Sequence, residues 1–154
     1  NLLVVRTFSK SRSLAGARVG FAVASEALAA DLNALRFSFN PYNINRLTLV
    51  AAEAAVDSND YYVKNCRIIA ENRAYTVAAL SKLGFETVPS VANFIFTRCS
   101  SIKGDDLYRK LKAKGVLVRH WKKPEIQDYV RVTIGSREQM DIFLARVQEL
   151  LKEE

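Results

Sequence analysis

RTFSKSRSLAGARVG, residues 6–20, is the segment from which the interpretation of the whole chain follows. The apolar, β-branched residues 2–5 precede it, and a similar run, residues 19–24, closes it. Both runs are typical of buried strands. We therefore expect a polar, cationic loop that joins two strands of a core sheet.

The loop carries side chains that suit one kind of chemistry. Thr7 and Ser9 supply hydroxyls, Lys10 supplies an amine, and Arg18 follows eight residues after the lysine. A lysine amine forms a Schiff base with an aldehyde, and it must be unprotonated to react. A partly desolvated pocket and neighbouring positive charge, here from Arg12 and Arg18, favour that state.

A phosphate-binding role completes this hypothesis. The Arg18 guanidinium can hold phosphate oxygens through two parallel hydrogen bonds, and Gly16 lets the backbone approach a ligand closely. An aldehyde that carries a phosphate describes pyridoxal phosphate. The arrangement thus favours a pyridoxal phosphate site centred on Lys10 over an exposed basic loop.

The composition limits the remaining function classes. The net charge of +7 permits nucleic-acid binding. No nucleic-acid motif accompanies the charge, so we interpret it as solvated surface. No segment has the length and hydropathy of a membrane span and none resembles a signal peptide, so we expect a cytoplasmic protein without membrane contact. Cys66 and Cys99 are far apart and His120 is the only histidine, which favours reduced thiols and no metal site.

The first half of the chain predicts the end of a larger domain. The chain does not begin with Met, and its first residues already have the pattern of a buried strand, so we expect a piece of a longer polypeptide. A helix with Ser25 as N-cap follows the second strand, and helices are expected over residues 45–57 and 61–83. The polar break between these two helices predicts a first domain of residues 1–57 and a second of residues 58–154.

The second half predicts a small α+β domain. Strands are expected over residues 85–88, 92–97, 116–119 and 129–134, with a helix from residue 104 to Gly115 and a last helix after residue 136. Ser136 and Gln139 have the spacing of a capping box. The order strand, strand, helix, strand, strand, helix predicts helices on one face of a sheet.

Arg131 is the candidate substrate-binding residue of this second domain. It lies in the middle of a predicted strand, on the same face as Tyr129 and Thr133. An arginine within a core strand is costly unless it is paired, and the carboxylate or phosphate of a substrate would pair it. An edge-strand arginine that reaches solvent fits the spacing equally well. Arg119 can share the anionic group, although a solvated strand end fits it better.

The segments just quoted resemble a known family. Residues 6–21 resemble the lysine segment of fold-type I aminotransferases, and most of all that of the histidinol-phosphate aminotransferase group. Residues 39–45, 92–95, 115–119 and 129–135 continue the resemblance in the same order. It implies an α/β fold in which the chain forms the end of the large cofactor-binding domain and the small C-terminal α+β domain.

The resemblance also implies roles for individual residues. Lys10 would form the Schiff base with pyridoxal phosphate, and Arg131 would bind the carboxylate of glutamate. Thr7, Ser9 and Arg18 would contact the cofactor phosphate, and Arg119 would assist at a substrate phosphate. The implied reaction moves an amino group from histidinol phosphate to 2-oxoglutarate in histidine biosynthesis, in an enzyme that is a homodimer at full length.

The family places other essential groups upstream of the lysine. These are the carboxylate that faces the pyridine nitrogen, the ring stacked on the cofactor and much of the phosphate cup. We therefore expect the chain alone to be inactive. A threonine-phosphate decarboxylase or an aromatic aminotransferase is an alternative within the same class. A non-catalytic oligomerisation domain is an alternative outside it, against which the joint presence of Lys10, Arg18 and Arg131 argues.

Overall fold

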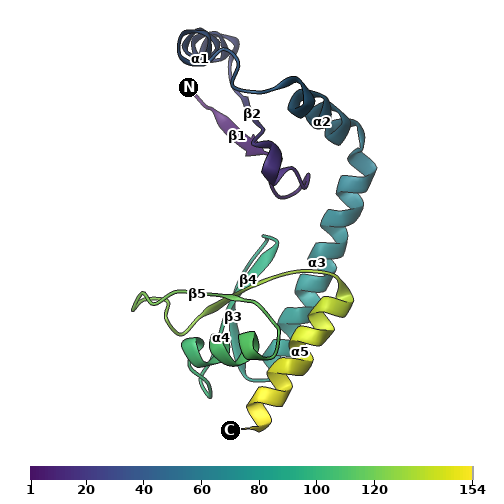
Figure 1. The fold of residues 1–154 in the computed structure, drawn as a ribbon, viewed down its shortest axis with the longest axis vertical. Helices are drawn as coiled ribbons and strands as arrows, with labels where there is room; N and C mark the ends of the chain where they lie inside the picture. Colours follow the sequence, from purple (N-terminus) through teal and green to yellow (C-terminus); the bar gives the residue numbers. More distant parts are fainter. Residues whose placement is uncertain (154) are drawn as a thin grey trace. The chain divides into compact units, whose positions relative to one another are not determined.

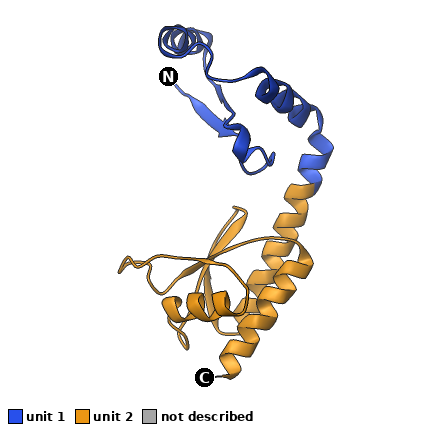
Figure 2. Cartoon of the chain, in the orientation of Figure 1, with its two compact units in different colours: residues 1–64 blue, residues 65–154 orange. Residues whose placement is uncertain are grey.

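The computed structural model describes residues 1–153. They form two compact units, which divide after residue 64 (Figure 2). The elements of the first unit are β1 (Val4–Thr7), a short 3-10 helix (Ala15–Ala17), β2 (Gly20–Val23), α1 (Glu26–Phe39), α2 (Arg46–Asp57) and the start of α3 (Asn59–Lys82) (Figure 1). The second unit holds the rest of α3, then β3 (Phe85–Val88), β4 (Phe94–Cys99), α4 (Gly104–Ala113), β5 (Arg119–His120), β6 (Val130–Thr133) and α5 (Arg137–Lys152).

The two strands of the first unit pair only with each other. β1 and β2 are antiparallel, with Val4 opposite Val23 and Thr7 opposite Gly20. The prediction of two strands is confirmed, but the prediction that they are buried is wrong for this structure, in which every residue of both strands is exposed. A two-stranded ribbon cannot cover both of its own faces. Phe8 and Val19, in the connecting segment, are the buried hydrophobic residues of this unit.

Side-chain caps set the helix starts of the first unit. The Ser25 side chain accepts a hydrogen bond from the Leu28 N–H at the start of α1, as predicted, and the Asn45 side chain caps α2 in the same way. α3 begins two residues earlier than predicted, which reduces the expected polar break to Ser58. The chain divides into its two compact units after residue 64, inside α3. A domain boundary after residue 57 stays a prediction.

The second unit is built on one antiparallel sheet with the strand order β3-β4-β6-β5. The predicted succession of strands and helices is confirmed. The strand expected over residues 116–119 is wrong in its limits, since β5 begins only at Arg119 and includes His120. The Val116 N–H donates to the Leu111 carbonyl at the end of α4 instead of joining the sheet. The capping box of α5 is present with both of its hydrogen bonds.

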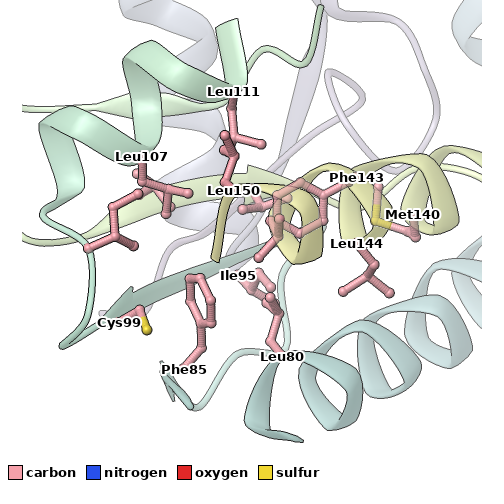
Figure 3. Close-up of a cluster of buried hydrophobic side chains, with 14 of the residues drawn as sticks. Leu80, Phe85, Ile95, Cys99, Leu107, Leu111, Met140, Phe143, Leu144 and Leu150 are labelled. Carbon is pink, nitrogen blue, oxygen red and sulfur yellow. The ribbon is translucent and has the colours of Figure 1, made fainter. Parts of the chain in front are cut away.

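The core of the second unit lies on one face of this sheet. Alternate residues of β4, namely Ile95, Thr97 and Cys99, are buried, while their neighbours are only half-buried. The core side chains from the helices include Leu80, Leu107, Leu111, Phe143 and Leu150 (Figure 3). With one face of β4 in the core, the opposite face, which carries Phe94 and Phe96, is free for a site.

The described residues contain neither a membrane-spanning helix nor a metal-binding cluster. None of their helices has both the length and the hydropathy that a bilayer span requires. Among the same residues, no three His, Cys, Asp or Glu side chains lie close enough to hold a metal ion together. Cys66 is exposed and Cys99 is buried, and both are free thiols.

Candidate functional site

Phe8 anchors the loop that carries Lys10. Its N–H donates to the Val19 carbonyl at 3.2 Å, and its carbonyl accepts from the Leu14 N–H at 3.0 Å. Its ring meets the Phe21 ring edge-on, with centroids 5.7 Å apart. Because Phe8 is buried, the chain turns outward directly after it, and Lys10 is exposed.

Backbone geometry brings Arg18 back beside β1. Ser13 and Arg18 have positive φ angles, 59° and 56°, which turn the chain sharply within the loop. At Gly20, opposite Thr7, a Cβ would lie 2.6 Å from the Arg6 carbonyl oxygen, so only glycine fits there. The Arg18 side chain therefore leaves the loop next to the end of β1.

Thr7, Ser9 and Arg18 line one open pocket of about 420 Å³. The Ser9 N–H donates to the Thr7 hydroxyl oxygen at 3.0 Å, and the Arg18 guanidinium donates to the Ala15 carbonyl at 3.1 Å. The structure thus brings three of the four predicted cofactor residues together. Lys10, the fourth, follows Ser9 directly but does not line this pocket.

The second unit holds Arg131 in an interior strand. β6 lies between β4 and β5, so the alternative of an edge-strand arginine is wrong. The guanidinium carbon lies 5.2 Å from the ring centroid of Phe94 and 5.5 Å from that of Trp121. The Nε atom is buried and has no hydrogen-bond partner among the described residues. Within the described residues, Arg131 therefore makes no hydrogen bond through Nε that a ligand would have to replace.

Arg119 lies directly opposite Arg131 in the β5–β6 pair. Its guanidinium carbon is also 5.5 Å from the Trp121 ring centroid, so one indole contacts both arginines. Like charges in opposite positions of a sheet repel each other. Within the described part of the chain, neither arginine forms an ion pair, whereas Arg98 on β4 is paired with Glu86 at 2.7 Å. The two free cations suit an anion bound between or beside them.

His120 holds β5 from the side away from the two arginines. Its side chain is 5% exposed, with Nε2 2.7 Å from the Gln127 carbonyl oxygen and its ring stacked on Tyr108 of α4. Since successive strand residues face opposite sides, this anchoring keeps Arg119 and Trp121 on the open face of the sheet.

The aromatic residues that line this face were not predicted from the sequence. Trp121 meets Phe96 edge-on, with centroids 6.1 Å apart, and Phe96 stacks on Tyr129 at 4.6 Å. The available signal was the spacing of Arg119 and Trp121, two residues apart at the end of a strand. The predicted site residues therefore lie in two clusters. The cluster of the first unit comprises Thr7, Ser9 and Arg18, and that of the second unit comprises Arg119 and Arg131.

The family model for aminotransferase class I and II matches residues 1–147. The chain belongs to this family. This confirms the family that the motifs predicted, and the matched residues include Lys10 and both clusters described above.

Two relatives with similar sequences are named histidinol-phosphate aminotransferases. A histidinol-phosphate aminotransferase of Brachyspira hyodysenteriae is 47% identical over 152 residues, which are 99% of this chain and 43% of the relative. One of Clostridium botulinum is 42% identical over 151 residues, 98% of this chain and 43% of the relative. The chain therefore spans less than half the length of these relatives.

A solved structure confirms the predicted aminotransferase fold. The histidinol-phosphate aminotransferase of Sinorhizobium meliloti, crystallised in complex with pyridoxal-5'-phosphate, matches 99% of this chain with a TM-score of 0.83 and 25% identity. The match covers 42% of that structure.

Proposed function

We propose that this chain supplies the C-terminal part of a pyridoxal phosphate-dependent aminotransferase that acts on histidinol phosphate. One observation carries the proposal: Thr7, Ser9 and Arg18 line a single pocket beside the exposed Lys10. The names of the Brachyspira and Clostridium relatives support the reaction, and the ligand of the Sinorhizobium structure supports the cofactor.

The residues of the first unit fit this cofactor. Two hydroxyls and a guanidinium are suitable donors for a phosphate group, and the volume of about 420 Å³ lies in the usual range of small-molecule pockets. When bound, pyridoxal phosphate withdraws electrons from the substrate Cα, which allows the Cα proton to leave.

The chain's own residues would divide the remaining work. Thr7, Ser9 and Arg18 bind the phosphate and so fix the orientation of the ring. Lys10 would hold the cofactor through its side-chain amine, and the same amine is suited to move the substrate Cα proton. Lys10 therefore acts first as the anchor and then as the base.

The arginines of the second unit would select the substrates. Histidinol phosphate and 2-oxoglutarate both carry an anionic group away from the reacting carbon. Arg131, with its unpartnered buried Nε, binds the carboxylate of the dicarboxylic substrate and the anionic end of the amino substrate. Arg119, opposite it, adds a second positive charge at the substrate phosphate.

The complete enzyme is proposed to be a cytoplasmic homodimer. The chain spans about 43% of its relatives' length, so we expect the chain alone not to catalyse the reaction.

A threonine-phosphate decarboxylase would bind a similar phosphate-bearing substrate; one from Porphyromonas gingivalis shares the fold, with a TM-score of 0.81 at 24% identity. That likeness concerns the fold alone, whereas the relatives at 42–47% identity are named for histidinol phosphate.

Reductive trapping tests the cofactor site. The chain is incubated with pyridoxal phosphate, reduced with borohydride and mapped by mass spectrometry, with Lys10→Ala as the control. We expect the label at Lys10 to exceed that at Lys64, an exposed lysine of the same unit. Equal labelling of the exposed lysines would contradict the site.

A chimera tests the substrate. This chain replaces the matching segment of the Brachyspira relative, and amino transfer to 2-oxoglutarate is measured from histidinol phosphate and from phenylalanine. We expect histidinol phosphate to be the better donor. Preference for phenylalanine would favour an aromatic aminotransferase, and loss of carbon dioxide from threonine phosphate would favour the decarboxylase.

A further inference from the structure

Arg12 makes three contacts with the junction of α2 and α3. One guanidinium nitrogen donates to the Ala55 carbonyl at 2.6 Å, and the other donates to the Asn59 side-chain oxygen at 3.1 Å. The guanidinium carbon lies 3.9 Å from the ring centroid of Tyr62. Arg12 is only two residues from Lys10, whereas its partners lie more than forty residues further along the chain.

The junction is a favourable place for an arginine. Ala55 is in the last turn of α2, where the carbonyl groups have no partner within the helix. A cation at a helix C-terminus is also favoured by the helix dipole. The planar guanidinium can serve two acceptors and stack on an aromatic ring at the same time, which a lysine ammonium cannot do.

These contacts act on the loop that carries Lys10. Phe8 holds the loop at its start, and the Ser13 N–H donates to the Lys10 carbonyl at 3.1 Å. Arg12, between these points, ties the loop to the helix junction. We propose that Arg12 is a positioning residue that fixes the Lys10 loop on the α2–α3 junction. The inference rests on the proposed role of Lys10, and it replaces the expectation that Arg12 acts as a charge beside the amine.

Hydrogen exchange measured by mass spectrometry tests the anchoring on the chain itself. We expect the amides of residues 9–14 to exchange about 10–100-fold faster in Arg12→Ala than in the unchanged chain, because a charged pair of hydrogen bonds is lost. Arg12→Lys should restore part of the protection. Arg36→Ala is the matched control, since the Arg36 guanidinium stacks on the ring of its neighbour Phe37 on α1, and the substitution should leave the loop unchanged. Equal exchange in the unchanged chain and in Arg12→Ala, including no protection in either, overturns the inference.

Trapping with pyridoxal phosphate separates positioning from simple stability. The ratio of label at Lys10 to label at Lys64 should fall about tenfold in Arg12→Ala and recover partly in Arg12→Lys. An unchanged ratio, with Lys10 labelled selectively in both proteins, overturns the positioning role. If Arg12→Ala loosens the loop but Lys10 is not labelled even in the unchanged chain, the proposed function fails and the anchoring by Arg12 stands.

Discussion

Replacing Arg131 with methionine should remove anion binding without markedly destabilising the second unit. The substitution deletes a positive charge inside the sheet but keeps an unbranched side chain that extends as far as the arginine Nε. Methionine can also pack its sulfur against the Phe94 and Trp121 rings that the guanidinium now contacts. We therefore expect this substitution to have a much larger effect on the affinity for an anion than on the free energy of unfolding.

The opposing contributions to folding are of similar size. Two guanidinium–ring contacts stabilise the folded state by about 0.5–1 kcal/mol each. The buried, unpartnered Nε costs about 1–3 kcal/mol, and repulsion from Arg119 directly opposite adds about 0.2–1 kcal/mol. The expected net change in the free energy of unfolding therefore lies between a loss of about 1 kcal/mol and a gain of about 3 kcal/mol. Loss of a charged partner from a bound anion costs about 2–5 kcal/mol, a factor of about 30 to several thousand in affinity.

The single tryptophan provides the assay for both quantities. Trp121 is the only tryptophan of the chain and contacts Arg131, so its fluorescence reports urea unfolding of the second unit and titration with 2-oxoglutarate. Arg67→Met, at an exposed arginine of α3, is the control. The reasoning is refuted if Arg131→Met lowers the free energy of unfolding by more than about 3 kcal/mol, or if it leaves the 2-oxoglutarate titration unchanged.

Three further substitutions test the fold of the second unit. Leu111→Ala, at a fully buried core position, should lower the free energy of unfolding by about 2–5 kcal/mol in urea; a loss below 1 kcal/mol would contradict the described core. Gly104→Ala should lower the melting temperature by several degrees, because the new Cβ would lie 2.8 Å from the Asp128 carbonyl carbon; an unchanged temperature would mean that this close approach is absent. Hydrogen bonding to Arg146 is the main cause that lowers the pKa of Glu149. The resulting stabilisation is present above the ordinary glutamate pKa of about 4.3 and is lost as the pH falls through the lower pKa of the folded state. Glu149→Gln should therefore reduce the loss of stability at acidic pH. An unchanged pH dependence would exclude this contribution.

Locally determined features could be predicted from the sequence. The Ser136–Gln139 capping box and the Ser25 cap depend on residues three positions apart, and both form as expected. The limits of β3 also match, since Gly84, with φ +80°, ends the preceding helix and Pro89 follows the strand. Thr7, Ser9 and Arg18 could be grouped for the same reason, because one short loop carries all three.

Features that depend on strand order could not be predicted. β6 pairs with β4 and β5, so its interior place in the sheet, and with it the environment of Arg131, depends on pairing between distant segments. The contact of Trp121 with both arginines follows from the β5–β6 register and from the anchoring of His120. Likewise, the partners of Arg12 lie on helices more than forty residues away, and no local pattern indicates them.

The difference between the two hydrophobic cores has a thermodynamic consequence. The first unit buries Phe8, Val19 and Thr48, whereas the second buries a continuous cluster drawn from its sheet and helices. A ligand that binds only the folded form of a marginal unit adds RT ln(1 + [L]/Kd) to its stability. For the first unit, pyridoxal phosphate would then contribute to folding as well as to chemistry. The melting of this unit should depend on the concentration of pyridoxal phosphate, while the melting of the second unit should not.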